Sequence, residues 1–444
     1  MQKKILGMAV AAALAAPALA LAQSSVQVYG TVHLSVNQMK ISGDTAGLLN
    51  GDTKYGVASH ASNWGLRSTE SLGGGMTAWF QAEFNMQMAR NNGVNDGENT
   101  ARNSGVGLRG SWGNIYLGNW ETPWAQTFRF WDVGSIGGWG PVTSIIGRRE
   151  TTGSAPSRNC SNLQSGAGSG PAGGGTPNAP TAAGLATPTN ICGQDAETAN
   201  GGTAVGAYAL WRRFSNAVHY ETPVWSGFQG KLAIMPNERK SNYVVAAANT
   251  AAGNPATASR AAQFNENPSA WSASVGWTGM GGRARAFIAT MQAKDFSTVA
   301  QTDGGWTIGG GYNFGPAELG GVYEKYTYKL AAGDSTAKEW ALALAVPVGP
   351  GKIGASYAKA SALSGSAAPA QAANDTAAKM WNLGYQWDLS KRTNLGFGVA
   401  KIDNGRDIAF TWTGQIPTQN GFSSGAVATG QDQTNFFISM RHSF

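Results

Sequence analysis

The sequence has little charge, almost no cysteine and no long hydrophobic run beyond its first residues. Charged residues make up 13% of its 444 positions. The 32 basic residues, less two in an expected leader, exceed the 25 acidic ones by 5. Because the basic residues are scattered, nucleic acid is a poor candidate partner. No later apolar stretch reaches the roughly 18 residues of a spanning helix, which excludes a helical membrane protein.

The first 22 residues have the features of a secretion signal. Lys3 and Lys4 precede an apolar run that ends in the small-x-small sequence Ala20-Leu21-Ala22. We therefore expect residues 1–22 to be a signal peptide and residues 23–444 to form one exported domain. The two cysteines, Cys160 and Cys192, would lie in a compartment that permits oxidation. We predict a disulfide between them, closing a loop of about 30 residues.

Motifs for catalysis are also missing. The sequence has no CxxC, HExxH or phosphate-binding loop. Its four histidines are His33, His60, His219 and His442. None of them stands in a pattern typical of a nucleophilic site. We predict no enzymatic activity, no cofactor and no metal site, although the segment DNGRD (Asp403, Asp407) leaves metal binding open beside a simply solvated loop.

The sequence is instead rich in glycine and aromatic residues, and its apolar residues recur at every second position. It has 62 glycines and 44 aromatic residues, a composition suited to strands and turns. In the final stretch, QTNFFISMRHSF, Phe436, Ile438 and Met440 alternate with Ser439 and Arg441. The same alternation recurs in segments that begin near residues 26, 271, 308, 340 and 381. Each such segment predicts a strand with one apolar and one polar face.

The connections between these strands alternate in length. Seven connections are short turns, six of them with glycine or proline, and eight are long polar segments, among them residues 38–60, 120–212 and 331–337. A soluble sandwich would have turns of similar length at both ends. An outer-membrane barrel has short turns on one side, long loops on the other, and must close because lipid satisfies no open edge. The sequence thus predicts an all-β fold, a 16-stranded antiparallel transmembrane barrel in outer-membrane lipid, with short periplasmic turns and long extracellular loops.

Alternation also predicts which charges face the water-filled lumen. Leu66 and Leu108 facing lipid would place Arg67 and Arg109 inward, and the same reasoning applies further along the chain. The predicted lumen residues are basic at Arg67, Arg109, Arg213, Lys231 and Arg441, and acidic at Glu83 and Glu221. An excess of basic side chains in a narrow pore favours anions. The alternative is that each arginine only forms ion pairs on a wall that has to be polar.

Several segments resemble a known family, the general trimeric porins of Gram-negative bacteria, in particular the sixteen-stranded β-proteobacterial type. The segments are VYGTVHLSV, SNWGLRSTESLGGGMTAWFQAEF, SGVGLRGSWGNIYLGNWETP and RRFSNAVHYETPVWSGFQGKL, together with the terminal phenylalanine. The resemblance covers essentially the whole mature chain. It implies a homotrimer whose third extracellular loop folds into the lumen and narrows it. It also implies that Phe444 is part of the signal read by the barrel-assembly machinery.

The chain departs from the family pattern in two places. It reads Gly118-Asn119 where the family usually has Gly-Arg before the third loop, so one pore arginine is missing or moved. The third loop, residues 120–212, is also much longer than the resemblance implies. Its candidate constriction residues are Glu121, Arg129, Asp132, Arg148, Arg149 and Glu150. Its tryptophans, Trp124, Trp131 and Trp139, would either pack the loop against the wall or line a path for a sugar or aromatic solute.

The sequence therefore predicts an outer-membrane porin. Small hydrophilic solutes and inorganic ions would cross it by passive diffusion, with a mild preference for anions. Two other functions stay open. One is a substrate-specific outer-membrane channel, and the other is a plugged barrel that acts as an adhesin or structural protein.

Overall fold

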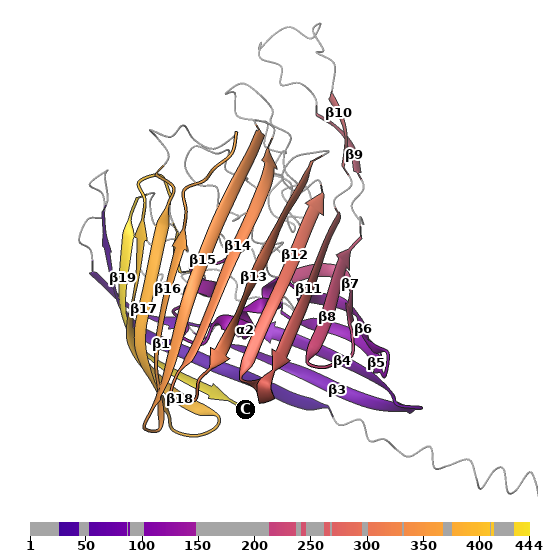
Figure 1. The fold of residues 1–444 in the computed structure, drawn as a ribbon, viewed down its shortest axis with the longest axis horizontal. Helices are drawn as coiled ribbons and strands as arrows, with labels where there is room; N and C mark the ends of the chain where they lie inside the picture. The colour runs from indigo at the N-terminus through magenta and orange to yellow at the C-terminus, as the bar shows by residue number, and fades with distance from the viewer. Residues whose placement is uncertain are drawn as a thin grey trace, which may run out of the picture.

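The computed structural model describes residues 26–43, 53–86, 88, 102–147, 213–236, 241–245, 262–266, 269–294, 301–330, 333–366, 375–408, 410–412 and 430–444. Most of these residues belong to one antiparallel sheet that closes on itself (Figure 1). The expected signal peptide, residues 1–22, lies outside the described residues, as do Cys160 and Cys192. None of the described helices is long and apolar enough to cross a membrane.

The first half of the sheet contains β1 (Gln27–Ser42), β2 (Thr53–Ser59), β3 (Asn63–Gly73), β4 (Met76–Asn85), β5 (Ser104–Gly110), β6 (Gly113–Glu121), β7 (Arg213–Glu221) and β8 (Phe228–Met235). The second half contains β11 (Ser269–Gly279), β12 (Ala284–Lys294), β13 (Thr302–Asn313), β14 (Glu318–Leu330), β15 (Gly333–Val348), β16 (Gly351–Ala360), β17 (Ala378–Asp388), β18 (Thr393–Asn404) and β19 (Asp432–Ser443). A separate hairpin pairs β9 (Ser241–Val245) with β10 (Ala262–Glu266).

The sheet closes between its first and last strands. β1 pairs with β19 from Thr31 opposite Ser443 to Ser42 opposite Asp432. Gly30 and Phe444 exchange backbone hydrogen bonds of 3.2 and 3.0 Å at the end of this seam. β2 and β3 both pair with β1 and form one strand interrupted at residues 60–62, so the 17-stranded sheet has sixteen barrel strands. This confirms the predicted closed, sixteen-stranded barrel.

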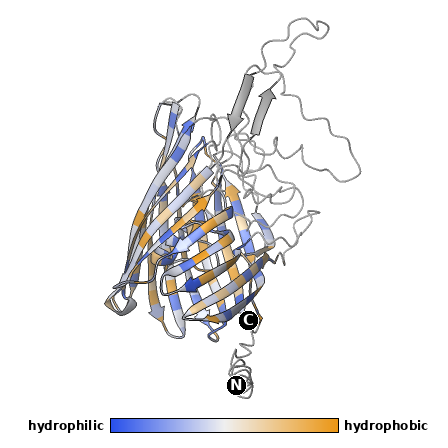
Figure 2. Ribbon diagram, turned by 90° about the vertical axis from the view of Figure 1, so that its right-hand side faces the viewer, coloured by the Kyte–Doolittle hydropathy of each residue, from blue (hydrophilic) through white to orange (hydrophobic). Residues whose placement is uncertain are grey.

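The two faces of the wall differ as the alternation predicts. Val36 is 60% exposed on the outside, whereas its neighbour Asn37 is 1% exposed on the inside. Leu342 is likewise 60% exposed, next to the buried Ala341 and Ala343. Hydrophobic and hydrophilic residues alternate along the strands in Figure 2. Apolar side chains exposed all around a closed sheet are suited to lipid, and polar ones inside it to water.

Two expected loops are shorter than the sequence suggested. β1 continues to Ser42 and β2 begins at Thr53, so strand structure covers much of residues 38–60. β14 and β15 leave only residues 331–332 between them, where 331–337 was expected. In both places the strands continue through polar residues such as Lys40 and Thr336. Polar composition suggested loops here because a strand that extends beyond the lipid needs no apolar face. Such a strand still keeps its backbone hydrogen bonds to its neighbours.

The segment after β6 turns into the barrel. It contains η1 (Ala125–Thr127), α2 (Phe128–Trp131) and η2 (Pro141–Thr143), and Figure 1 shows α2 within the ring of strands. The flanking strands end at Glu121 and begin at Arg213. One further short helix, η3 (Met280–Gly282), forms the tight turn between β11 and β12. We call the described part of this segment, residues 122–147, the inner loop.

Candidate functional site

The inner loop has its own apolar core, which it packs against the barrel wall. Trp124, Trp131 and Trp139 are 2%, 1% and 0% exposed. Trp139 lies edge-on to Trp412 with ring centroids 5.3 Å apart, and Phe130 packs against Phe287 of β12 at 5.6 Å. Buried rings of this kind hold the loop in place and present little surface to a solute. Of the two roles considered for the tryptophans, the geometry favours packing.

Glycines in the wall make room for the inner loop. A Cβ atom on Gly320 of β14 would lie 1.9 Å from the backbone oxygen of Trp131. A Cβ atom on Gly354 of β16 would lie 2.6 Å from the backbone oxygen of Gly134. No side chain tolerates such distances, so glycine is what permits the loop backbone to touch the wall.

Polar contacts fix the rest of the inner loop. The Gly147 amide donates to Glu324 Oε1 at 2.5 Å and to Glu339 Oε2 at 3.2 Å. Lys352 Nζ donates to the Val133 carbonyl at 3.3 Å, and Asn382 Nδ2 donates to the Gly134 carbonyl at 3.2 Å. These bonds come from β14, β15, β16 and β17, so the loop is held across one side of the lumen.

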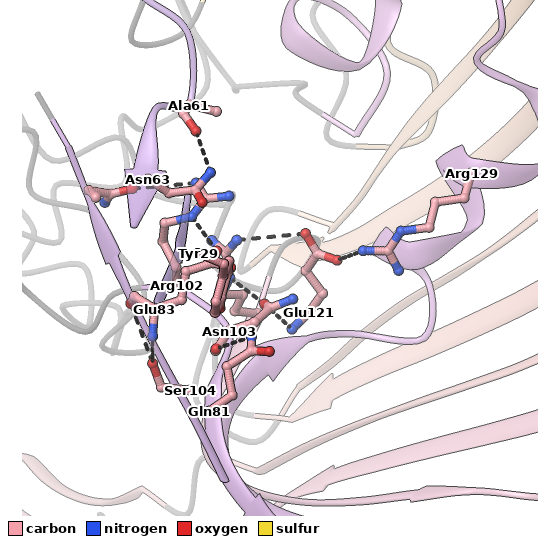
Figure 3. Close-up of polar contacts among 12 residues, drawn as sticks. Tyr29, Ala61, Asn63, Gln81, Glu83, Arg102, Asn103, Ser104, Glu121 and Arg129 are labelled. Carbon is pink, nitrogen blue, oxygen red and sulfur yellow. Dashed lines mark hydrogen bonds and ion pairs between the residues drawn. The ribbon is translucent and has the colours of Figure 1, made fainter. Parts of the chain in front are cut away.

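The opposite side of the lumen carries a cluster of arginines and glutamates (Figure 3). Arg102 Nε lies 2.5 Å from Glu83 Oε1, and the other oxygen of Glu83 accepts a 3.0 Å hydrogen bond from the Tyr29 hydroxyl. Arg67 stacks over the Tyr29 ring at 4.9 Å and donates to Gln27 Oε1 at 3.1 Å. The side chains of Arg102 and Glu83 are 17% and 13% exposed, whereas Arg67 is exposed.

A second part of this cluster links the wall to the inner loop. Glu121, at the end of β6, accepts from Arg129 of α2 at 2.6 Å and lies 3.6 Å from Arg213 of β7. Asn103 Oδ1 accepts from both the Glu121 amide and Arg213 Nε. The Arg129 side chain is 50% exposed, and that of Arg213 is 9% exposed. Arg129 is thus the member of this group that a passing ion can approach.

The other predicted lumen residues are less closely grouped. Lys231 lies 3.0 Å from Glu221 and 2.6 Å from Gln126 of the inner loop, so its charge is paired. Arg109 and Arg441 lie on the inward-facing side of β5 and β19 and are exposed. Arg148, Arg149 and Glu150 lie outside the described residues.

Simple alternation does not give the position of Arg213. A β-bulge lets Phe214 pair with Trp120 while Ala217 pairs with Gly118, so one extra residue enters β7. Asn216 at the bulge has a positive φ of 51°. Bulges insert a residue and shift the faces of a strand. Arg213 lies beyond the bulge, directly opposite Glu121 in the sheet, and this position brings it into the cluster.

Sequence reasoning missed two residues of the site. Arg102 lies two residues before β5 and pairs with Glu83. Lys352 faces inward on β16 and bonds the inner loop. The sequence signal for Lys352 is its position in β16: it has the same parity as the buried Ser356 and the opposite parity to the lipid-facing Ile353.

Asp132 ends α2 inside the lumen. Its Oδ1 accepts a 2.6 Å hydrogen bond from the Ser135 hydroxyl. Burial raises the pKa of this carboxyl to about 6, against the opposing effects of Ser135 and Lys352. Its charge therefore changes within the range of ordinary buffers, and it lies in the loop that narrows the lumen.

Two histidines make contacts that the sequence did not indicate. His60 Nε2 lies 2.5 Å from the Ser35 hydroxyl, and its ring meets Trp139 edge-on at 5.0 Å. Ser35 and His60 are 2% and 3% exposed, so the inner loop covers this pair. His219 stacks on Tyr116 with ring centroids 4.7 Å apart. Within the described ranges, no three His, Cys, Asp or Glu side chains are grouped closely enough to hold a metal ion.

Comparison with known proteins supplies the family. The chain is 28% identical over 453 aligned positions to outer membrane porin protein 32 of Delftia acidovorans, covering both chains fully. The fold is similar to the anion-selective porin from Comamonas acidovorans, with a TM-score of 0.62 at 24% identity, covering 95% of this chain and 100% of that one. It is also similar to the trimer form of OmpT from Vibrio cholerae, with a TM-score of 0.54 at 12% identity, covering 95% and 99%.

The model of one protein family, described as Gram-negative porin, matches residues 9–407. This match spans most of the chain and agrees with the closed sixteen-stranded barrel. The chain belongs to the Gram-negative porin family.

Proposed function

We propose that this outer-membrane channel passes small hydrophilic solutes and inorganic ions by passive diffusion and prefers anions. The observation that carries the preference is a difference in exposure between lumen charges of opposite sign. Arg67, Arg109 and Arg441 are exposed, and the Arg129 side chain is 50% exposed. The acids Asp303, Glu324 and Glu339 are 1%, 6% and 3% exposed.

This difference matters because an ion in the lumen responds most to charges that it can approach. The arginine cluster contains four arginines, Arg67, Arg102, Arg129 and Arg213, against two glutamates, Glu83 and Glu121. Rings of charge in a narrow aqueous path raise the local concentration of counter-ions and lower their barrier. The inner loop brings Arg129 into that path, so Arg67, Arg109, Arg129 and Arg213 with Glu83 and Asp132 form the proposed constriction.

The proposal extends to assembly. A homotrimer is supported by family membership and by the trimer form of the OmpT relative. A role for Phe444 in recognition by the barrel-assembly machinery is supported by its place at the closing seam, where its backbone bonds Gly30. Residues 1–22 would act as the signal peptide that directs the chain to export.

The test is the reversal potential of the purified full-length protein in a planar bilayer that separates two concentrations of potassium chloride. We expect the sign that corresponds to chloride being more permeant than potassium. A reversal potential of the opposite sign would contradict the proposed anion preference, but the protein would still be a channel. A variant with Arg67→Gln and Arg129→Gln should move the potential towards zero, whereas Lys391→Gln in a short turn, far from the constriction, should leave it unchanged.

A further inference from the structure

Four lysines form a row on the outside of the barrel. They are Lys325 on β14, Lys338 on β15, Lys359 on β16 and Lys379 on β17. Lys325 lies directly opposite Lys338, and Lys359 lies directly opposite Lys379. These four strands are consecutive neighbours in the sheet and follow one another along the wall in Figure 1. We call these residues the outer lysine row.

The outer lysine row shares its face with the apolar residues that contact lipid. Lys338, Trp340 and Leu342 have the same parity on β15, and Leu342 is 60% exposed. Lys379, Trp381 and Leu383 have the same parity on β17, and Leu383 is 49% exposed. Lys359 and Lys379 are themselves exposed, and Lys325 and Lys338 are half-buried. The four ammonium groups therefore belong to the lipid-facing surface and not to the lumen.

An aromatic row fixes the height of these lysines in the membrane. Each lysine has an aromatic residue two positions closer to the short-turn end of its strand, namely Tyr323, Trp340, Tyr357 and Trp381. The rings of Trp340 and Tyr357 lie 5.4 Å apart, as do those of Trp306 and Tyr323. Aromatic belts mark the boundary between hydrocarbon and headgroups. The outer lysine row thus lies just beyond that boundary, on the side of the long extracellular loops.

The protein supplies few negative charges to balance those of the outer lysine row. Within the described part of the chain, none of the four lysines forms a salt bridge, whereas the neighbouring pairs Lys329–Asp334 and Lys401–Asp403 do. Asp403 is opposite Lys379 in the sheet but bonds Lys401. Like charges directly opposite each other destabilise a sheet. Two such pairs on adjacent strands therefore call for an anion from outside the chain.

We propose that the outer lysine row binds the phosphate groups of an anionic glycolipid in the outer leaflet. Lysine ammonium groups are mobile point charges that make strong, charge-assisted hydrogen bonds to phosphate. A lipid satisfies both parts of the surface, since its headgroup meets the lysines while its acyl chains lie along Leu342 and Leu383. A free anion would use only the lysines.

The experiment measures binding of a fluorescent, bisphosphorylated lipid A to the purified full-length protein in neutral detergent without divalent cations. The variant carries Lys325→Gln, Lys338→Gln, Lys359→Gln and Lys379→Gln. Its matched control carries Lys391→Gln and Arg392→Gln in the short turn before β18, at the other membrane boundary. Dephosphorylated lipid A and inorganic phosphate serve as competitors.

We expect the four-lysine variant to bind lipid A at least about tenfold more weakly, because each basic residue near an anionic surface contributes roughly a fivefold factor. The control and the wild type should bind alike, neither competitor should displace the lipid at equal concentration, and added salt should weaken binding. Unchanged binding by the variant, or equal binding of the dephosphorylated lipid, would overturn the proposal. Displacement by inorganic phosphate would also overturn it, since a general anion site needs no lipid.

Channel conductance separates this proposal from the proposed function. The outer lysine row lies outside the lumen, so the four-lysine variant should keep wild-type conductance and selectivity, which also shows that it is folded. If it fails to fold, the two-residue variants Lys325→Gln/Lys338→Gln and Lys359→Gln/Lys379→Gln apply the same test. If both two-residue variants bound the lipid as the wild type does, the proposal would be contradicted.

Discussion

At the scale of single residues, exposure decides which lumen charges act on an ion. Glu83 and Glu121 are each tied to an arginine, and Glu324 and Glu339 are buried where they accept from the Gly147 amide. Arg129 keeps half of its side chain exposed despite its contact with Glu121. A count of acids and bases on the inward face would therefore understate the positive potential of the lumen.

Arg129→Gln tests this view at one position. We expect the chloride permeability to fall by up to about fivefold and the potassium permeability to rise, so that their ratio falls, since a unit charge about 4 Å from an ion is worth roughly 1 kcal/mol in water. Arg129→Lys keeps the charge and should retain most of the preference. Reversal potentials of the two variants, measured side by side, give the answer. Equal ratios for Arg129→Gln and the wild type would mean that ions do not approach this residue.

Asp132 makes the preference depend on pH. Its folded-state pKa is raised from 3.8 to about 6, so folding favours its neutral form. The stability that this provides is present below pH 3.8 and is lost as the pH rises through about 6. Ionisation also adds a negative charge to the lumen, so anion preference should be stronger at pH 5 than at pH 7.5. Asp132→Asn should reduce the difference between the two pH values, and an unchanged difference would assign it to another group.

At the scale of elements, the position of the inner loop depends on wall glycines as much as on loop residues. Gly320 faces the loop, whereas its neighbour Gly321 faces lipid. A Cβ atom on Gly320 would lie 1.9 Å from the Trp131 backbone oxygen, but on Gly321 its nearest neighbour is a Leu342 side-chain atom at 3.1 Å. The same substitution at these adjacent positions should therefore have different effects.

We expect Gly320→Ala to destabilise the seated loop by about 1–3 kcal/mol, the usual cost of overpacking. The loop should move towards the lumen and change single-channel conductance, while the barrel itself remains closed. Gly321→Ala is the matched control and should leave conductance near the wild-type value. If both variants conducted alike, contact with Gly320 would not determine the position of the loop.

Sequence patterns predicted the strands better than their ends. Val36, Leu342 and Ile438 alternate with residues that the barrel buries, and that period follows directly from lipid on one side and water on the other. Strand length was less predictable, because Lys338 and Thr336 continue β15 beyond the lipid without any apolar signal. The bulge near Asn216 changes the face of the residues before it, and neither composition nor period indicates such a bulge.

The sequence predicted only part of the candidate site, because strand periodicity does not show which residues meet across the lumen. Arg67 and Glu83 followed from parity on regular strands, and both lie in the arginine cluster. The pairing of Lys231 with Glu221, and the Arg102 contact to Glu83, depend on distances between separate strands. Parity gives the face of a residue but not its neighbours across the lumen. Which charges remain exposed therefore required the folded chain.

At the scale of the whole molecule, one closed sheet separates lipid from water. Pairing of β1 with β19 removes the open edge, and the inner loop occupies part of the enclosed space. The remaining volume has to be wet if the exposed arginines are to act on ions. The barrel, the inner loop and the charge distribution are thus parts of one claim, that of a hydrated passage across the membrane.

The most direct test of that claim is single-channel conductance of the purified full-length protein in a neutral planar bilayer. We predict discrete current steps at low voltage, with a conductance that rises in proportion to the conductivity of the bathing salt solution, as in a water-filled pore. A protein that inserts into the bilayer and yields no such steps would contradict the account.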